Sequence, residues 1–281
     1  MIILNKKNRT TTSIKFGNGI PYISFNALEQ TGMVVNAFST RQGGVSVGCL
    51  ESMNLGFNRG DLDENVLKNH KIFAKAVGFP YENIVTTNQT HTTNVRVVTK
   101  EDCGKGIAKD RDYSDVDGLI TNIPGIVLAT YYADCVPLYI LDPINKAIGL
   151  SHSGWKGTVN RIGENTLKLM NENYGTNPKD VICCIGPSIC QDCYEISEDV
   201  ANEFINEFGK NNKILYNKGN GKYQLNLWKA NEWILLNSCI LPEHLAVTNL
   251  CTCCNSDLLF SHRASHGKRG TLAAFLALKE D

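Results

Sequence analysis

In the middle of this 281-residue chain stands Gly125-Ile126-Val127-Leu128-Ala129-Thr130-Tyr131-Tyr132-Ala133, an apolar run rich in β-branched and aromatic residues. Such a run predicts a buried strand, which here ends just before Asp134 and Cys135. A second apolar run, Ala147-Ile148-Gly149-Leu150-Ser151, predicts another strand that ends at His152. The two strand ends therefore carry a thiol and an imidazole, at the place where α/β enzymes usually keep their chemistry.

A third segment also ends in a histidine and is expected to be a strand: Ile84-Val85-Thr86-Thr87-Asn88-Gln89-Thr90-His91. If the three strand ends meet, His91, Cys135 and His152 form a soft or borderline metal site with an open coordination position. A nucleophilic Cys135 that is activated by one of the histidines, as in cysteine hydrolases, is an alternative interpretation. The spacing of the residues does not separate these two chemistries.

The composition indicates a soluble globular protein. Hydrophobic residues make up 42% of the chain, which is enough for a large core. Lys and Arg together number 28, as do Asp and Glu, so no net field attracts nucleic acid or an anionic membrane. No apolar stretch suits a secretory signal or reaches the roughly 18 residues of a spanning helix. We therefore expect a cytoplasmic protein that binds neither nucleic acid nor membrane.

Eleven cysteines are spread along the chain, including adjacent pairs at 183–184 and 253–254. Without a secretory signal, this pattern indicates reduced thiols rather than disulfides. Most of them would then be small buried apolar groups. The segments Cys190-Gln191-Asp192-Cys193 and Cys251-Thr252-Cys253-Cys254 nevertheless resemble the two halves of a zinc ribbon. A second, structural zinc is therefore a further hypothesis.

Helical and strand patterns alternate along the rest of the chain. Four segments have helical spacing: 61–77, 160–174, 198–208 and 224–239. Strands are predicted over 181–185 and 246–250, after an antiparallel portion at 23–39. We find no repeat and no linker, so we predict one domain over residues 1–281. Its class should be α/β (α+β), with layered mixed sheets flanked by helices.

Three features are candidates for binding an anion such as phosphate. Arg41 lies in a loop with two adjacent glycines, where backbone N–H groups can approach a ligand. Lys156 follows His152 in a turn that contains two further glycines. The helix predicted over 160–174 begins just after this turn, so its N–H groups near Thr158 would face whatever His152 faces.

Eight blocks of the chain, in order, resemble the YfiH family, formerly called polyphenol oxidase or laccase-domain proteins. They are Asn88-Gln89-Thr90-His91, Asp117-Gly118-Leu119-Ile120-Thr121, Ala133-Asp134-Cys135-Val136-Pro137, His152-Ser153-Gly154-Trp155-Lys156-Gly157-Thr158, Ile185-Gly186-Pro187-Ser188-Ile189, Cys193-Tyr194-Glu195, Cys251-Thr252-Cys253 and Phe260-Ser261-His262-Arg263. The similarity runs from about Phe38 to Leu276, and ordered blocks are more specific than any single one.

The resemblance implies a zinc-dependent purine nucleoside phosphorylase with a YfiH-like fold. Its substrates would be adenosine, inosine, guanosine and S-methyl-5'-thioadenosine, and it would also have adenosine deaminase activity. The family's metal ligands, which are also its catalytic residues, correspond to His91, Cys135 and His152. Deamination at the purine C6 would use the zinc chemistry of nucleobase deaminases.

The chain departs from the family pattern at two positions near these ligands. Asn88 stands where the family usually has a histidine that is not a ligand, so the change concerns the surroundings of the metal. Lys156 stands where arginine is commoner, which keeps the charge but loses the bidentate fork. Together with Arg41, these two residues are the predicted phosphate- or substrate-binding positions.

Copper-dependent, laccase-like polyphenol oxidation is the alternative activity, with copper in place of zinc. Multicopper oxidation requires several coppers and a histidine-rich sequence, whereas this chain has six histidines and no His-Cys-His sequence. A third interpretation is a non-enzymatic partner in cell-wall or division processes, which would leave the Cys/His/His set without a role. The residues do not rank the purine substrates, nor do they determine the oligomeric state.

Overall fold

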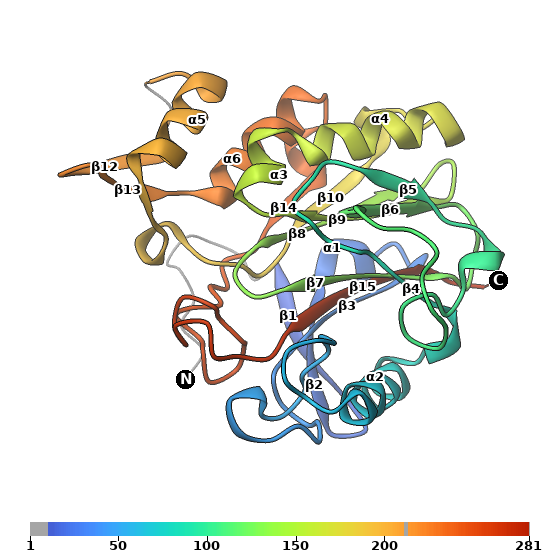
Figure 1. Cartoon of the computed structure of the whole chain (residues 1–281). Helices are drawn as coiled ribbons and strands as arrows, with labels where there is room; N and C mark the ends of the chain where they lie inside the picture. Colours follow the sequence, from blue (N-terminus) through green and yellow to red (C-terminus); the bar gives the residue numbers. More distant parts are fainter. Residues whose placement is uncertain (1–10, 211–212, 281) are drawn as a thin grey trace.

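The computed structural model describes residues 11–210 and 213–280, in which two six-stranded sheets are stacked face to face (Figure 1). The first sheet has the order β1-β2-β3-β15-β7-β4. Its strands are β1 Thr12–Gly17, β2 Ile20–Phe25, β3 Val34–Ser39, β15 Leu272–Leu278, β7 Val127–Tyr132 and β4 Ile84–Thr86. Neighbouring strands are antiparallel except β4 and β7, which are parallel, so the sheet is mixed.

The second sheet is also mixed, and its order is β14-β10-β8-β9-β6-β5. Its strands are β14 Leu245–Val247, β10 Ile182–Ile185, β8 Val136–Asp142, β9 Ala147–Ser153, β6 Gly118–Thr121 and β5 Val95–Val97. The pairs β10/β14 and β5/β6 are parallel, and the others are antiparallel. A small third sheet joins β11 Glu195–Ser197, β13 Lys222–Leu225 and β12 Leu215–Gly219.

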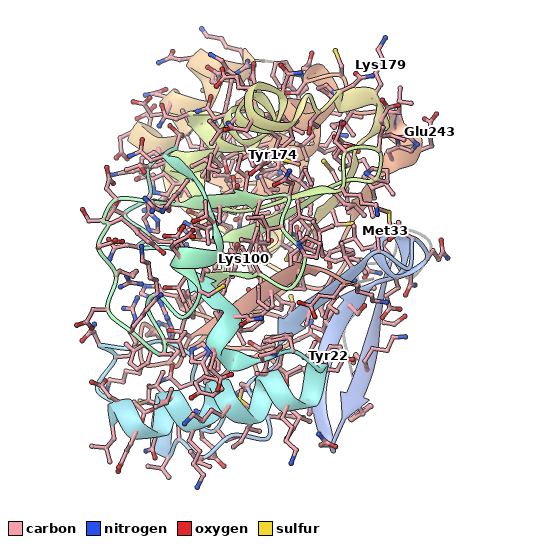
Figure 2. The ribbon with its side chains drawn as sticks, turned by 90° about the vertical axis from the view of Figure 1, so that its right-hand side faces the viewer. Tyr22, Met33, Lys100, Tyr174, Lys179 and Glu243 are labelled. Atoms are coloured by element: carbon pink, nitrogen blue, oxygen red, sulfur yellow. The ribbon has the colours of Figure 1, made fainter. Side chains whose placement is uncertain are left out.

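Helices cover the outer faces of the two large sheets, as Figure 2 shows from the side. The α-helices are α1 Asn26–Glu29, α2 Asp63–Val77, α3 Trp155–Val159, α4 Ile162–Tyr174, α5 Glu198–Phe208 and α6 Leu227–Asn237. Single 3₁₀ turns are η1 Gly48–Leu50, η2 Tyr81–Asn83, η3 Lys100–Asp102, η4 Pro178–Asp180, η5 Gln191–Cys193 and η6 Pro242–His244. Within the described residues, no helix is long and apolar enough to cross a bilayer.

The layers explain why the central strands are continuous apolar runs instead of alternating ones. In β9, Ile148 and Leu150 face the other sheet and join a core with Phe38 and Tyr132. On the opposite face, Gly149 lies against α4, where an added Cβ would approach Thr166 and Met170 to about 3 Å. A strand that is buried on both faces has apolar residues on both, so the alternation of apolar and polar residues is lost. The predicted class of layered mixed sheets flanked by helices is confirmed.

Several local predictions need correction. The strand predicted over 84–91 ends at Thr86, because the following polar residues leave the sheet edge. The helix predicted over 160–174 is preceded by a separate short helix, α3, and Arg161 in the left-handed region (φ 59°) breaks the two apart. The helix predicted over 224–239 begins only at Leu227, since Lys222–Leu225 pairs as β13.

Two central strands were not predicted at all. Val136–Asp142 (β8) follows Cys135 directly and pairs with β9 over its whole length. Leu272–Leu278 (β15), instead of the strand predicted over 246–250, is the last strand, and it lies between β3 and β7. The prediction of one domain over residues 1–281 stays a prediction.

Candidate active site

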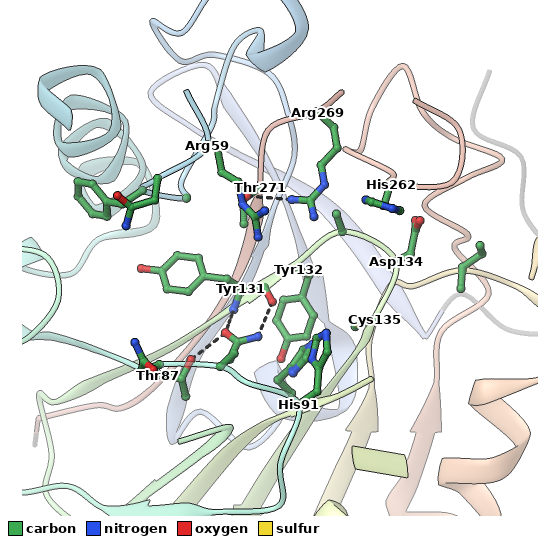
Figure 3. Close-up of a pocket in the computed structure, with 18 of the residues that line it drawn as sticks. Arg59, Thr87, His91, Tyr131, Tyr132, Asp134, Cys135, His262, Arg269 and Thr271 are labelled. Carbon is green, nitrogen blue, oxygen red and sulfur yellow. Dashed lines mark hydrogen bonds between the residues drawn. The ribbon is translucent and has the colours of Figure 1, made fainter. Parts of the chain in front are cut away.

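A cavity of about 520 Å³ opens beside the ends of β7 and β9 (Figure 3). This volume lies within the range of about 300–1,000 Å³ that is usual for small-molecule sites. His91, Cys135 and His152 line one part of it, and Arg59 and Arg269 line another. The cavity thus joins soft metal-binding donors to a positively charged wall.

His152 owes its orientation to the pairing of β9 with β6. Gly118 is paired with Ser151, so Asp117 stands opposite His152, and the His152 amide donates to the Asp117 carbonyl at 2.8 Å. The side chains meet as well, with His152 Nδ1 at 2.7 Å from Asp117 Oδ1 and both groups buried. Because Nδ1 is used in this way, Nε2 is the nitrogen left to face the cavity.

The same carboxylate holds the segment that carries His91. Its oxygens accept hydrogen bonds from the backbone amides of Thr90 (2.9 Å), His91 (3.2 Å) and Thr92 (3.0 Å). His91 itself has a positive φ of 65°, which turns its ring back toward His152. The two imidazoles stack with ring centroids 4.9 Å apart. One nitrogen of each ring and an oxygen of Asp117 lie within 4.8 Å of one another.

Cys135 arrives from the turn between β7 and β8. Val136 pairs with Ser153, so Cys135 stands next to Gly154 across the ladder. A Cβ added at Gly154 would lie 3.2 Å from Cys135 Sγ, 3.5 Å from His152 Cε1 and 3.6 Å from His91 Nδ1. The three predicted ligands therefore converge on the space that this glycine leaves open.

Charge and burial act in opposite directions on these groups. Burial would lower the pKa of His152, but the Cys135 sulfur and the Asp117 carboxylate, each hydrogen-bonded to its ring, raise this pKa to about 9. Burial and the neighbouring His152 lower the pKa of His91. Burial would raise the pKa of Asp117, but its hydrogen bonds from His152 and the backbone outweigh burial and lower it. The surroundings therefore favour the charged form of His152 and the neutral form of His91.

The donor set fits a zinc ion, with Asp117 in a supporting position. A thiolate and two imidazoles are ligands that zinc accepts, and three protein ligands leave a fourth position open. Asp117 already accepts hydrogen bonds from the His152 ring and from three backbone amides. We therefore interpret it as the residue that orients both histidines, a role that metal-bound histidines commonly require.

Two arginines that sequence analysis did not identify face this site. Figure 3 shows the guanidinium groups of Arg59 and Arg269 beside each other, near Thr271. Burial and the charge of Arg59 lower the pKa of Arg269. Among the described residues, no carboxylate forms an ion pair with either group. No recognised motif marks these residues, which lie in two loops that are distant in the sequence, and only the fold brings them together.

Comparison with known proteins identifies the family. A family model described as multi-copper polyphenol oxidoreductase laccase matches residues 35–279, which is most of the chain. The chain belongs to the YfiH family. The Bacillus subtilis (strain 168) protein named purine nucleoside phosphorylase YlmD is 36% identical over 252 residues, or 88% of this chain and 89% of that protein. The resemblance inferred from the ordered blocks is thus confirmed.

Two solved structures of the YfiH family have the same fold. The Bacillus licheniformis hypothetical protein YfiH superposes with a TM-score of 0.87 at 32% identity, covering 92% of this chain and 96% of that one. YlmD from Geobacillus stearothermophilus has the same TM-score of 0.87 at 31% identity and covers 100% of both chains. The likeness extends over both large sheets.

The other predicted phosphate- or substrate-binding residues lie at different distances from the cavity. Asn88 lines it, and its side-chain oxygen accepts the Asp115 amide at 3.2 Å. Lys156 lies over the Trp155 ring, and its charge contributes to lowering the pKa of His91. Arg41 does not line the cavity, because its guanidinium donates to the carbonyls of Glu51 and Ser256, each at 2.9 Å.

The helix end proposed as an anion site is not formed as expected. Thr158 lies inside α3, a helix of five residues, and its buried hydroxyl donates to the Gly154 carbonyl. The N-terminus of α4 begins only after Arg161. The helix nearest His152 is therefore too short to supply the macrodipole that the sequence pattern indicated.

The matching family model is described as a multi-copper enzyme, and the positions of the histidines bear on that description. All six histidines lie within the described residues, and the one group of three or more potential ligands there that contains histidine is His91, Asp117 and His152. His70 is buried against the Leu55 carbonyl at 2.9 Å. Multicopper centres are built from many histidines, which this arrangement does not provide.

Proposed function

We propose that this chain is a zinc-dependent purine nucleoside phosphorylase that also has adenosine deaminase activity. It would act on adenosine, inosine, guanosine and S-methyl-5'-thioadenosine, and partner molecules would be these nucleosides and phosphate. The observation that carries the proposal is the convergence of His91, Cys135 and His152 beside a cavity with two facing arginines. The naming of its relative from Bacillus subtilis as a purine nucleoside phosphorylase supports the choice of reaction.

Phosphorolysis consists of three changes, and this cavity supplies charged groups for the phosphate that takes part in it. The bond between ribose C1′ and the purine nitrogen breaks, a phosphate oxygen bonds to C1′, and a proton passes to the leaving base. Phosphate needs cationic partners, and we assign it to Arg59 and Arg269, whose fork-shaped groups match its oxygens. Binding phosphate there would also neutralise the repulsion between the two guanidinium groups.

The metal-binding role falls to His91, Cys135 and His152. When bound, a zinc ion with one open position supplies Lewis acidity toward a substrate atom or a water molecule, as deamination at the purine C6 requires. Asp117 accepts a hydrogen bond from Nδ1–H of His152, which fixes the tautomer of the ring. The unprotonated Nε2 is then the nitrogen that would bind the ion. The roles of Arg41, Lys156 and Asn88 stay predictions, as does a cytoplasmic location.

Product analysis tests this function directly. Metal-analysed protein is incubated with adenosine, with and without phosphate, and the products are separated by chromatography. We expect adenine and ribose 1-phosphate only when phosphate is present, inosine in both cases, and bound zinc instead of copper. Protein that contains copper and oxidises phenols without cleaving adenosine would contradict the proposal and favour the laccase-like alternative.

The structure also contains a feature of a second candidate, a cysteine hydrolase. Cys135, His152 and Asp117 form a hydrogen-bonded series, as in a nucleophilic triad. His91 has no part in such a triad, whereas it supplies a ligand in the metal site. Hydrolysis of an activated ester by chelator-treated protein, lost in Cys135→Ala, would favour the hydrolase. We expect chelation to remove activity instead.

A further inference from the structure

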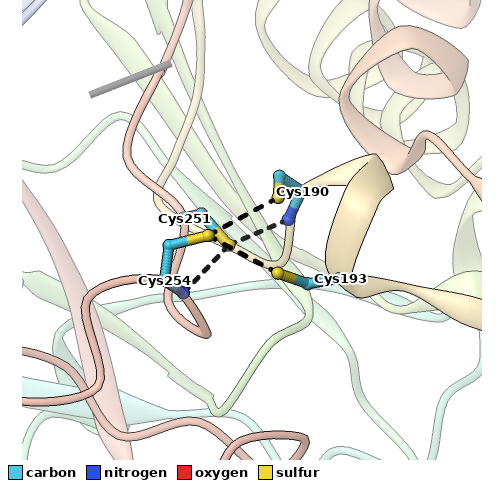
Figure 4. A group of neighbouring side chains, drawn as sticks. All are labelled: Cys190, Cys193, Cys251 and Cys254. Atoms are coloured by element: carbon cyan, nitrogen blue, oxygen red, sulfur yellow. Dashed lines mark hydrogen bonds between the residues drawn. The ribbon is translucent and has the colours of Figure 1, made fainter. Parts of the chain in front are cut away.

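Four cysteines from two distant segments meet outside the active site (Figure 4). We call Cys190, Cys193, Cys251 and Cys254 the cysteine cluster. The first two follow β10 and the last two follow β14, and these strands are parallel neighbours in the second sheet. An additional bridge between Ser188 and Cys251 continues their pairing. The fold therefore brings the two Cys-x-x-Cys segments to the same edge.

The sulfur atoms have the spacing of a tetrahedral metal site. All four lie within 4.8 Å of one another. Cys193 Sγ is 3.5 Å from Cys254 Sγ, and Cys190 Sγ is 4.0 Å from the same atom. Four sulfurs at about 2.3 Å from a zinc ion would be about 3.8 Å apart, so only small shifts are needed.

Backbone amides already donate to one of these sulfurs. The amide of Cys190 lies 3.2 Å from Cys251 Sγ, and the amide of Cys254 lies 3.4 Å from it. Such donors stabilise the negative charge of thiolate ligands. Cys190 and Cys251 are buried, while Cys193 and Cys254 lie nearer to solvent, which leaves a path by which an ion can enter. Four crowded thiolates repel one another unless a cation stands between them.

We propose that the cysteine cluster binds a second metal ion, a zinc ion held by four sulfur atoms. With four protein ligands the site is closed, so the ion is structural and performs no chemistry. This proposal does not rest on the proposed phosphorylase function, since none of the four cysteines lines the cavity. Because Zn²⁺ binds deprotonated thiols, each ligand loses its proton when the ion binds.

The position of the cluster gives this ion a task. Ile189 and Tyr194 flank the first cysteine pair, and both line the cavity. Arg263, which also lines the cavity, donates to the carbonyl of Cys193 at 2.9 Å and stacks on Tyr194 at 5.3 Å. An ion in the cluster therefore ties two loops together and fixes one wall of the cavity. Removal of the ion should make this wall more mobile and should affect the part of the cavity lined by Arg59 and Arg269 less.

Metal analysis of the full chain tests the proposal. We expect two zinc ions per chain in the unaltered protein and one in the double variant Cys193→Ser/Cys254→Ser. Cys253→Ser is the matched control, because this half-buried thiol lies between two ligands in the sequence yet is not part of the cluster. It should retain both ions and the same thermal transition.

A spectroscopic measurement tests whether the cysteine cluster binds a metal ion even if the double variant fails to fold. The Cys135→Ala variant, in which only the cluster is expected to hold metal, is stripped and titrated with cobalt(II). We expect one equivalent to bind with the intense visible absorption of a cobalt tetrathiolate, and zinc to displace it. Three results would overturn the proposal: no such absorption, iron as the native ion, or a disulfide between Cys193 and Cys254 in freshly purified protein.

Discussion

The cavity site and the cysteine cluster, the two places where we propose that a metal ion binds, differ in composition and in surroundings. The cavity site combines one sulfur with two imidazoles and adjoins a space of about 520 Å³. The cluster combines four sulfurs, and none of them lines that space. Zinc sites with four protein ligands are structural, whereas those with three keep a position for substrate or water. The difference assigns chemistry to the first site and rigidity to the second.

The two sites also differ in how their ligands are positioned. His91, Cys135 and His152 come from three separate parts of the chain, and sheet register together with Asp117 aligns them. The cluster uses two short segments with the same Cys-x-x-Cys spacing, so local turns place each pair. A site assembled from distant parts depends on the whole fold, whereas the cluster depends mainly on the β10/β14 edge.

Removing Cys135 should produce the largest effect and affect only one of the two sites. We expect Cys135→Ala to lower the rates of phosphorolysis and deamination by more than about 100-fold. Loss of a residue that only hydrogen-bonds to a metal ligand costs about 10–100-fold, and loss of a ligand itself should cost more. Bound zinc should fall by one ion per chain, while the cluster keeps its own. Cys49→Ala, at an exposed thiol, is the control for cysteine loss in general. Full activity after loss of the metal would refute a catalytic zinc.

Replacing Asp117 tests how the cavity site is organised. Asp117→Asn keeps the size of the side chain but loses the charge that fixes the His152 tautomer. We expect about 10–100-fold weaker zinc binding or activity, the range usual for partners of metal-bound histidines. Asp115→Asn is the matched control, because this exposed carboxylate bonds to Thr90 and Asn94 nearby without reaching either imidazole. Equal effects of the two variants would remove the orienting role of Asp117.

The strands that carry the ligands could be predicted because their signal is local. The apolar runs before Cys135 and at 147–151 correspond to β7 and β9, and helices α2 and α5 coincide closely with predicted segments. The proposed ligands His91, Cys135 and His152 were predicted from the ends of apolar and polar segments and again from the family resemblance, and all three lie close to Gly154 in the structure. Signals of this kind need only a short window of sequence.

The rest depends on contacts between distant residues, which no window contains. Asp117 and His152 are separated by 35 positions, and only the β6/β9 register makes them neighbours. Arg59 and Arg269 carry no motif, and their common role emerges only when two loops face the same cavity. The Cys-x-x-Cys spacing is visible in the sequence, but burial of the thiols as apolar groups is the interpretation that the sequence favours, because only the β10/β14 pairing brings the two segments together.

Arg59 and Arg269 give the cavity site a positively charged wall that can bind phosphate, and the cysteine cluster has no such wall. We expect Arg59→Ala and Arg269→Ala each to raise the KM for phosphate by about 10- to 150-fold, since a hydrogen bond to a charged group contributes about 1.5–3 kcal/mol. The KM for the nucleoside should change much less. Arg41→Ala serves as the comparison and tests the sequence-based candidate, whose guanidinium already donates to two carbonyls. A larger phosphate effect in Arg41→Ala would move the anion site to that loop.

Thr252 offers the smallest and most specific test, because it connects the two sites. Its buried hydroxyl donates to Asp134 Oδ1 at 2.6 Å. Asp134 directly precedes Cys135 of the cavity site, and Thr252 directly follows Cys251 of the cysteine cluster. Thr252→Val removes this bond at almost constant volume. We expect a loss of stability of about 1.5–3 kcal/mol in denaturant unfolding, because a carboxylate loses a partner. Thr248→Val, in the same part of the chain, removes a buried hydroxyl that does not contact Asp134.

Activity of Thr252→Val shows whether the two sites act on each other. Asp134 retains a second partner, the Arg263 amide at 2.7 Å, so the turn before Cys135 should keep its shape. We therefore expect kcat to stay within about threefold, and a double-mutant cycle with the cluster variant to give a coupling below about 0.5 kcal/mol, the value for independent sites. A larger coupling would mean that zinc in the cluster also positions Cys135. The two sites would then form one cooperative unit, and the division between chemistry and rigidity would have to be abandoned.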